Sequence, residues 1–219
     1  MNTNTLQIKL LIIGFIFIAS NSFAQEYTLW FRDGKIKTIK NYSLTDSSYY
    51  EGQIKFTTSN GKTKTKYLED VFSVVNKSGN EKIFYTPNEN LGETLSTSQM
   101  KSYVLGRQDA LNTKISPIIF IGGIVTGAAG AFIPQPEIKT NNGSFPLPLG
   151  IFVPATYVVV MGATPPAAEK LSQKFPDKAG NEPYLIGYQD GIRKKRIKNS
   201  LIGAGIGFVA GIVTLIAIN

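Results

Sequence analysis

The 219-residue sequence contains no cysteine and no histidine. Without cysteine the chain has no disulfide framework, no thiolate nucleophile and no lipid-anchored amino-terminal cysteine. Without histidine it lacks the usual general base near neutral pH and the commonest metal ligand. Catalysis would fall to carboxylates, lysines or hydroxyls with no histidine partner. We therefore expect no enzymatic activity, no catalytic residue, no bound metal and no cofactor.

Acidic residues are also scarce, with 15 Asp and Glu against 23 Lys and Arg and a formal net charge of +8. The excess is uneven, because residues 25–100 are nearly neutral whereas the chain from residue 101 onward has twelve basic and six acidic residues. Much of it forms a cluster directly before a long apolar run: Arg193, Lys194, Lys195, Arg196 and Lys198. A basic cluster beside such a run usually meets lipid headgroups. We expect the lipid bilayer as a partner and no nucleic acid.

Residues 1–24 have the pattern of a secretory signal peptide. One positive charge precedes the apolar core "LLIIGFIFIAS", and the segment ends in a small residue, Ala24. The core is too short and too weakly flanked for an ordinary membrane span, which favours a cleaved signal and leaves an uncleaved anchor as the alternative. We expect the mature chain to lie in the cell envelope.

Residues 25–88 predict a small all-β module. "YTLWFR" alternates apolar and polar residues, and Asp33-Gly34 and Asn60-Gly61 are turn signals between extended runs. Five or six strands in about 65 residues are too few for a two-layer sandwich, so we expect a bent sheet or a barrel. Residues 89–100 are rich in turn and polar residues and predict a linker, with Ser96 or Ser98 capping a helix that follows.

Residues 101–219 predict an α-helical membrane region with three uncharged runs, at about residues 115–133, 147–163 and 200–218. At 1.5 Å per residue the first and last extend roughly 28 Å, close to a hydrocarbon core of about 30 Å. Pro148 and Pro154 argue against a straight helix in the middle run and favour a kinked span or a re-entrant half-helix. The expected fold class is an α+β membrane protein, with an N-terminal β module followed by glycine-rich helical spans.

A polar stretch followed by a glycine-dotted apolar run occurs twice, as "YVLGRQDALNTKIS" and as "YLIGYQDGIRKKRIKNS". This order indicates an internal duplication. Since a glycine within a helical stripe needs a compensating contact, we expect the two polar helices to cross at the two glycines, each tyrosine covering the other helix. We expect Asp190 to pair with Arg193 or Lys194 and Asp109 to reach across to the second helix, with solvation of both aspartates as the alternative. The matched helix-packing residues are Tyr103, Gly106, Asp109, Tyr184, Gly187 and Asp190.

The apolar runs carry small residues every four positions, as a glycine zipper does. In lipid, close van der Waals packing through such stripes drives helix association. The stripes pack span against span within one chain or between the chains of a homo-oligomer, and we favour the first. The glycines concerned are Gly123, Gly127, Gly203, Gly207 and Gly211.

Membrane topology involves a conflict. A cleaved signal places the β module outside the cytoplasm, in the periplasm, and favours the inner over the outer membrane. If residues 115–133 and 147–163 form a hairpin, the basic cluster lies on that same side, against the positive-inside tendency. If the middle run only dips into the bilayer, the cluster is cytoplasmic. The duplication favours the hairpin, because both polar helices can then meet.

The order of "YVLGRQDA", "GATPP" and "KFPDKAGNEPYLIGYQDGIRKKRIKNSLIG" resembles a family of uncharacterised exported membrane-anchored proteins of Bacteroidota-type bacteria. Similar proteins often carry a small strand-rich module ahead of these motifs. The chain departs from them at residues 111–114, where they tend to have tyrosines and lysines. The resemblance implies an envelope location and this architecture, and it implies no reaction.

Three functions follow as hypotheses. The favoured one is a membrane-anchored envelope protein whose module binds an envelope protein or a cell-wall glycan. The alternative is a small oligomeric channel or membrane-perturbing protein built on the glycine stripes. A hydrolase using carboxylates such as Glu69 and Asp70, or a lysine–serine pair, is least favoured. Adjacent acidic side chains in a strand point to opposite faces, so Glu69 and Asp70 are expected to be a surface feature.

Overall fold

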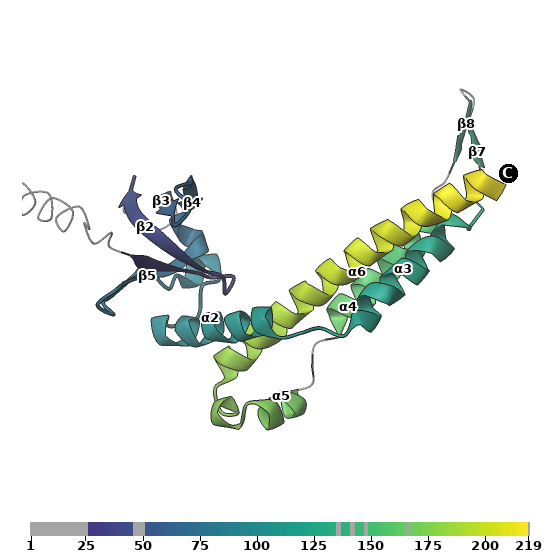
Figure 1. Cartoon of the computed structure of the whole chain (residues 1–219). Coiled ribbons are helices and arrows are strands. Elements are labelled where there is room, and N and C mark those ends of the chain that lie inside the picture. Colours follow the sequence, from purple (N-terminus) through teal and green to yellow (C-terminus); the bar gives the residue numbers. More distant parts are fainter. Residues whose placement is uncertain are drawn as a thin grey trace, which may run out of the picture.

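The computed structural model describes residues 26–45, 51–134, 137–140, 143–146, 149–164, 166 and 168–218. A sheet module comes first in the chain and a long helical region follows (Figure 1). This order confirms the expected α+β arrangement. The predicted signal peptide, residues 1–24, lies outside the described residues.

The described strands form a six-stranded antiparallel sheet in the order β4-β3-β2-β1-β5-β6. Because β4 and β6 are its two edges, the described sheet is open, and the barrel that the sequence also allowed is not closed. Register shifts in the β1–β5 and β2–β3 pairs mark irregularities of the kind that bend a sheet. The strands are β1 (Tyr27–Phe31), β2 (Ile36–Leu44), β3 (Gln53–Thr58), β4 (Thr63–Tyr67), β5 (Val71–Asn76) and β6 (Glu81–Ile83), with the short helix η1 (Leu68–Asp70) before β5.

One face of the sheet carries the main core of the module. Alternation along the strands places every second side chain on this face. Its buried members are Leu29, Phe31, Ile39, Ile54, Phe56, Leu68, Val71 and Val74. The predicted turn at Asp33-Gly34 joins β1 to β2, with φ at +82° at the glycine.

Helix α2 (Thr97–Asn112) packs against the side chains of the opposite face. Phe72 and Tyr85 from the module and Met100 and Val104 from α2 form a buried cluster, against which Trp30 packs. Ser96 caps the helix in a capping box with Gln99. Helix α2 therefore begins inside the predicted linker, residues 89–100, which also contains the short helix η2 (Glu89–Leu91).

The helical region continues with α3, a two-stranded hairpin, α4, α5 and α6. The hairpin and α5 were not expected from the sequence. Helix α6 is 37 residues long and joins the second polar stretch to the last apolar run without a break. The elements are α3 (Pro117–Ala131), β7 (Glu137–Thr140), β8 (Gly143–Pro146), η3 (Leu149–Ile151), α4 (Phe152–Ala163), α5 (Ala168–Lys174), η4 (Pro176–Lys178) and α6 (Glu182–Ile218).

The first copy of the duplicated pattern forms two helices, α2 and α3, whereas the second forms one continuous helix, α6. Helices α2 and α3 are bent by 71° at the break between Asn112 and Pro117. Pro117 disfavours helical geometry at Ser116, whose side chain instead caps α3. No proline lies at the corresponding place in α6, so that helix runs on.

Helices α3 and α4 run antiparallel. A Cβ added at Gly130, near the end of α3, would lie 2.3 Å from the backbone oxygen of Gly150. Near the start of α3, the Ile119 oxygen accepts a hydrogen bond from Tyr157 Oη at 3.1 Å. Residues 116 and 164 therefore lie at the same end of the bundle, next to the polar half of α6, as in the hairpin arrangement (Figure 1).

Among the described residues, one helix, Glu182–Ile218, is long and apolar enough to cross a membrane, and the bent pair α2–α3 adds a second if it counts as one span. The middle apolar run is a shorter helix, Leu149–Ala163. Pro154 lies in the first turn of α4, where its missing N–H costs no helical hydrogen bond. The kinked span or re-entrant half-helix stays a prediction for this run, and Pro148 lies outside the described residues.

Candidate functional site

Helices α2 and α6 cross where their backbones are in direct contact. A Cβ added at Gly106 would lie 2.1 Å from the Tyr184 backbone oxygen. One added at Gly187 would lie 2.1 Å from the Tyr103 backbone oxygen. Any side chain at either position would collide with backbone atoms, so glycine sets the separation of the two helices.

Two reciprocal hydrogen bonds flank this crossing. Tyr103 Oη donates to Asp190 Oδ2 at 2.7 Å. Tyr184 Oη donates to Asp109 Oδ2 at 2.6 Å. The matched tyrosines and aspartates of the two stretches thus bond across the pair of helices. The expected pairing of Asp190 with Arg193 or Lys194 is wrong within the described part of the chain, where the aspartate accepts from the tyrosine.

Replacing either Tyr103 or Tyr184 by phenylalanine is expected to destabilise the crossing of α2 and α6. Each change removes a donor from a partly buried carboxylate, and an unsatisfied polar group of this kind costs about 1–3 kcal/mol. We expect Tyr103→Phe and Tyr184→Phe each to lower the thermal unfolding midpoint of the detergent-solubilised protein. Tyr67→Phe is the matched control, since Tyr67 is exposed on the edge strand β4. Unfolding midpoints equal to that of the control in both variants would contradict the role of these bonds.

The five span glycines line the contact between α3 and α6. An added Cβ would lie 2.5 Å from the Ser200 oxygen at Gly123 and 2.1 Å from the Ala204 oxygen at Gly127. On α6 it would lie 2.3 Å from the Phe120 oxygen at Gly203, 2.0 Å from the Ile124 oxygen at Gly207 and 2.6 Å from the Ala131 Cβ at Gly211. The stripes are therefore occupied within one chain. Gly205, on another side of α6, has open space around it.

Two residues of the basic cluster donate hydrogen bonds to backbone carbonyls at the ends of other helices. Lys195 Nζ donates to the backbone oxygens of Leu111 at 2.7 Å and Thr113 at 2.6 Å. Arg196 donates to the backbone oxygen of Thr164, just after α4. The last carbonyls of a helix lack partners within it, and cations are favourable there. Sequence reasoning missed this role; the other three members, Arg193, Lys194 and Lys198, are exposed.

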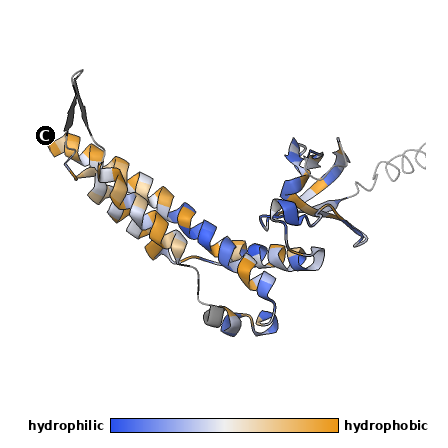
Figure 2. Cartoon of the chain, turned by 180° about the vertical axis from the view of Figure 1, so that it is seen from behind, coloured by the Kyte–Doolittle hydropathy of each residue, from blue (hydrophilic) through white to orange (hydrophobic). Residues whose placement is uncertain are grey.

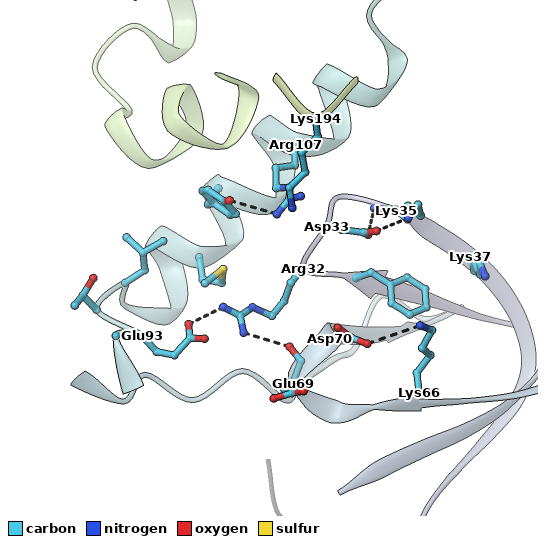
Figure 3. A pocket seen from close by; sticks show the side chains of 16 residues that line it. Arg32, Asp33, Lys35, Lys37, Lys66, Glu69, Asp70, Glu93, Arg107 and Lys194 are labelled. Atoms are coloured by element: carbon cyan, nitrogen blue, oxygen red, sulfur yellow. Dashed lines mark hydrogen bonds and ion pairs between the residues drawn. The ribbon is translucent and has the colours of Figure 1, made fainter. Parts of the chain in front are cut away.

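A cavity of about 510 Å³ opens beside the crossing, between the β1–β2 turn, residues 92–95 and helix α2 (Figure 3). Three ion pairs line it: Arg32 with Glu93 at 2.6 Å, Lys66 with Asp70 at 3.8 Å, and Lys35 with Asp33. Its other lining residues are Phe31, Lys37, Glu69, Gly92, Thr94, Leu95, Met100, Tyr103, Arg107 and Lys194.

Arg107 is the buried charge of this cavity, with 8% of its surface exposed. Its NH1 donates to Tyr103 Oη at 3.3 Å, and its guanidinium carbon lies 5.6 Å from the centre of the Tyr103 ring. Its Nε is buried with no hydrogen-bond partner in the described chain. The sequence signal for this residue is the charged difference within the matched motif, "GRQD" against "GYQD".

The β1–β2 turn packs directly on Arg107. A Cβ added at Gly34 would lie 2.6 Å from the Arg107 carbonyl carbon. Burial raises the pKa of the neighbouring Asp33, but hydrogen bonds from Lys35 and the charges of Lys35 and Arg107 outweigh it, so the pKa lies below its usual value. Asp33 is therefore ionised near neutral pH, with an oxygen bonded to the Lys35 backbone N–H at 3.0 Å.

A second charged contact ties the module to α2. Glu81 Oε2 accepts from Lys101 Nζ at 2.5 Å, and its other oxygen accepts from Ser73 Oγ at 2.6 Å. Burial raises the pKa of Glu81, but these two hydrogen bonds and the Lys101 charge lower it overall. The ionised carboxylate is therefore the form that holds the edge strand β6 to α2.

The described residues contain no cluster of three or more acidic side chains able to hold a metal ion. Comparison of the chain with protein-family models, with curated proteins and with solved structures found no match.

Proposed function

We propose that the chain is a membrane-anchored cell-envelope protein that presents its β module at the bilayer surface on a packed helical stem, in a structural or partner-binding role. The observation that carries this proposal is the apolar outer surface of α3, α4 and the second half of α6. Figure 2 shows this end of the molecule as predominantly hydrophobic and the opposite end as mixed or hydrophilic. Exposed members are Ile118, Ile121, Val125, Phe152, Val159, Val160, Leu201, Ile206, Val209, Val213 and Ile216.

Lipid chains are the environment that suits this surface. No charged side chain occurs in residues 117–134, 149–164 or 200–218. Soluble monomers rarely expose contiguous apolar patches larger than a few hundred Å². With small residues facing inward and branched residues facing outward, the bundle follows the packing rule of membrane helices.

The hairpin arms, Pro117–Ala131 and Leu149–Ala163, each have fifteen residues. At 1.5 Å per residue they extend about 22 Å, less than a hydrocarbon core of about 30 Å. Bilayers meet such a mismatch by local thinning at modest cost. We propose that the hairpin crosses twice and that α6 crosses once, through its apolar half.

We propose the exported side of the inner membrane for the β module, because residues 1–24 have the pattern of an export signal. The basic cluster then lies on that same side, against the positive-inside tendency. Lys195 and Arg196 are bound to helix-end carbonyls, which gives them a local role in the bundle. The module would bind an envelope protein or a glycan. The oligomeric channel loses its motivation, because the glycine stripes are filled within one chain.

Side-specific cysteine labelling tests this proposal in a chain that has no native cysteine. We would place single cysteines at Lys62 in the module, at Asn199 beside the basic cluster and at Val209 on the outer face of α6. In spheroplasts of a bacterial host, a membrane-impermeant maleimide is expected to label the first two positions and to spare the third until detergent is added. Val209→Cys is 62% exposed without a bilayer, so rapid labelling there would overturn the anchor. Labelling of Lys62→Cys and Asn199→Cys only after lysis would overturn the exported orientation alone.

A further inference from the structure

We infer that the cavity between the β module and the helical stem binds a phosphate ester, with Arg107 and Lys194 as its cationic contacts. This site goes beyond the proposed anchoring role and does not depend on it. The first observation is the state of Arg107, which is 8% exposed yet has a buried Nε without a partner. A buried charge without a counter-ion is costly, and an anion in the cavity would supply one to the guanidinium.

The ion pairs around the cavity involve basic residues of the module, so within the described chain positive charge without a carboxylate partner remains on the side formed by the helical stem. Asp33, Asp70 and Glu93 each pair with a basic residue of the module, as Figure 3 shows. Among the described residues, neither Arg107 nor Lys194 has a carboxylate within ion-pair distance. Both stand on the helical stem, and Figure 3 shows them together on one side of the cavity. Glu69 is exposed on the module, where its backbone oxygen accepts from Arg32 at 3.2 Å.

Close helix packing brings the two cations together. Arg107 lies on α2 beside Gly191 of α6, where an added Cβ would lie 3.2 Å from the Arg107 backbone oxygen. Lys194 follows Gly191 by three residues, so it lies on the same face of α6 one turn further on. The glycine thus allows a buried guanidinium and a mobile ammonium to share one anion.

The chemistry of a phosphate suits these two groups. A guanidinium offers a planar fork of N–H donors that matches two phosphate oxygens, and a lysine adds a point charge. The cavity volume of about 510 Å³ is within the range of small-molecule sites, roughly 300–1,000 Å³. Phe31, Leu95 and Met100 add apolar wall to it. The ligand is therefore a phosphate with an organic substituent.

Two sources can supply a phosphate ester at this place. Lys194 lies seven residues before Leu201, or about 10 Å along α6. The headgroup layer adds only about 5–8 Å beyond the hydrocarbon core. The cavity thus lies near the headgroups, so a phospholipid or a soluble ester is able to reach it.

Calorimetric titration of the full chain tests the site, in a non-ionic detergent free of phosphate. The soluble probe is glycerol 3-phosphate, and the lipid probe is a short-chain phosphatidylglycerol added to the micelles. We expect one or both to bind and glycerol alone not to bind. Lys194→Ala is expected to weaken binding about ten-fold, the equivalent of one charge-assisted contact. Arg193→Ala is the matched control, an exposed neighbour that does not line the cavity.

Each outcome bears on the inference. Binding of phosphatidylglycerol alone assigns the headgroup as the source, and binding of glycerol 3-phosphate assigns a soluble ester. Binding of neither probe overturns the site, as does equal binding by the Lys194→Ala and Arg193→Ala variants. Arg107→Met should abolish binding while keeping side-chain volume; if it fails to fold, the pair of α6 variants decides. Failure here leaves the anchor untouched, because no bilayer is used.

Discussion

Gly207→Leu is expected to separate α3 from α6 and to unfold the apolar bundle while the β module remains folded. A Cβ at this position would lie 2.0 Å from the Ile124 backbone oxygen and 2.7 Å from its carbonyl carbon. Backbone cannot move aside as a flexible side chain can, so the helices must part along the contact. Overpacking typically costs about 1–3 kcal/mol, and a clash between two helix backbones belongs at or above the upper end of that range. The packing of the α3 and α6 glycine stripes against each other within one chain depends on this contact.

The chain offers a close control two residues away on the same helix. Gly205→Leu introduces the same side chain where an added Cβ meets nothing within 4 Å. We expect Gly205→Leu to retain the wild-type unfolding midpoint in detergent and Gly207→Leu to lose a large part of it. Limited proteolysis should then release a protease-resistant module from Gly207→Leu alone. Equal resistance of the bundle in the two variants would rule out the α3–α6 contact.

Gly187→Leu is expected to abolish the crossing of α2 and α6. An added Cβ would lie 2.1 Å from the Tyr103 oxygen and 2.8 Å from its carbonyl carbon. Leucine would push the helices apart and break both tyrosine–aspartate bonds, which require the present separation. The contact of α2 with the sheet, through Phe72 and Met100, should survive because it lies on another face of α2.

Proximity of the two helices is measurable by crosslinking. Asn181 Nδ2 donates to Ser102 Oγ at 3.1 Å, so a Ser102→Cys/Asn181→Cys pair should be joined by a short bifunctional maleimide. We expect Gly187→Leu to abolish this crosslink. Gly180→Leu, with open space around its added Cβ, should preserve it. Trp30, the only tryptophan, packs near the α2–sheet contact and should keep its emission in both variants. An unaltered crosslink in Gly187→Leu would show that the helices do not meet at this glycine.

Much of the architecture follows from patterns that are local in the sequence. Alternation and the Asp33-Gly34 turn predict strands because each strand buries one face, and the structure has a sheet there. Glycines in a helical stripe predict a close helix contact, since an isolated helix gains nothing from them. Ser96 and Ser98 both predict a helix start, and Ser96 is the residue that caps α2. The sequence was less informative about boundaries, because the linker residues are partly helical.

The missed features have identifiable causes. The β7–β8 hairpin lies between two apolar runs, and its strands of four residues each are too short for a clear alternation of apolar and polar residues. The break between α2 and α3 is signalled by Pro117, which disfavours helical geometry at Ser116. The environment of Arg107 could not be predicted, because its cavity is closed by the β1–β2 turn some seventy residues earlier. Such a site depends on the packing of distant elements, which local patterns do not specify.

In the proposed anchoring, the unbroken length of α6 sets the distance between the β module and the membrane. Its 37 residues extend about 55 Å, and a hydrocarbon core takes up about 30 Å of a helix that stands upright in it. The remaining ~25 Å of α6 lies outside the hydrocarbon core. Helix α2 packs against this part of α6 and connects it to the sheet. In the proposed anchoring, the module would therefore lie at a fixed distance from the membrane, and it would bind only partners that enter the layer at that distance.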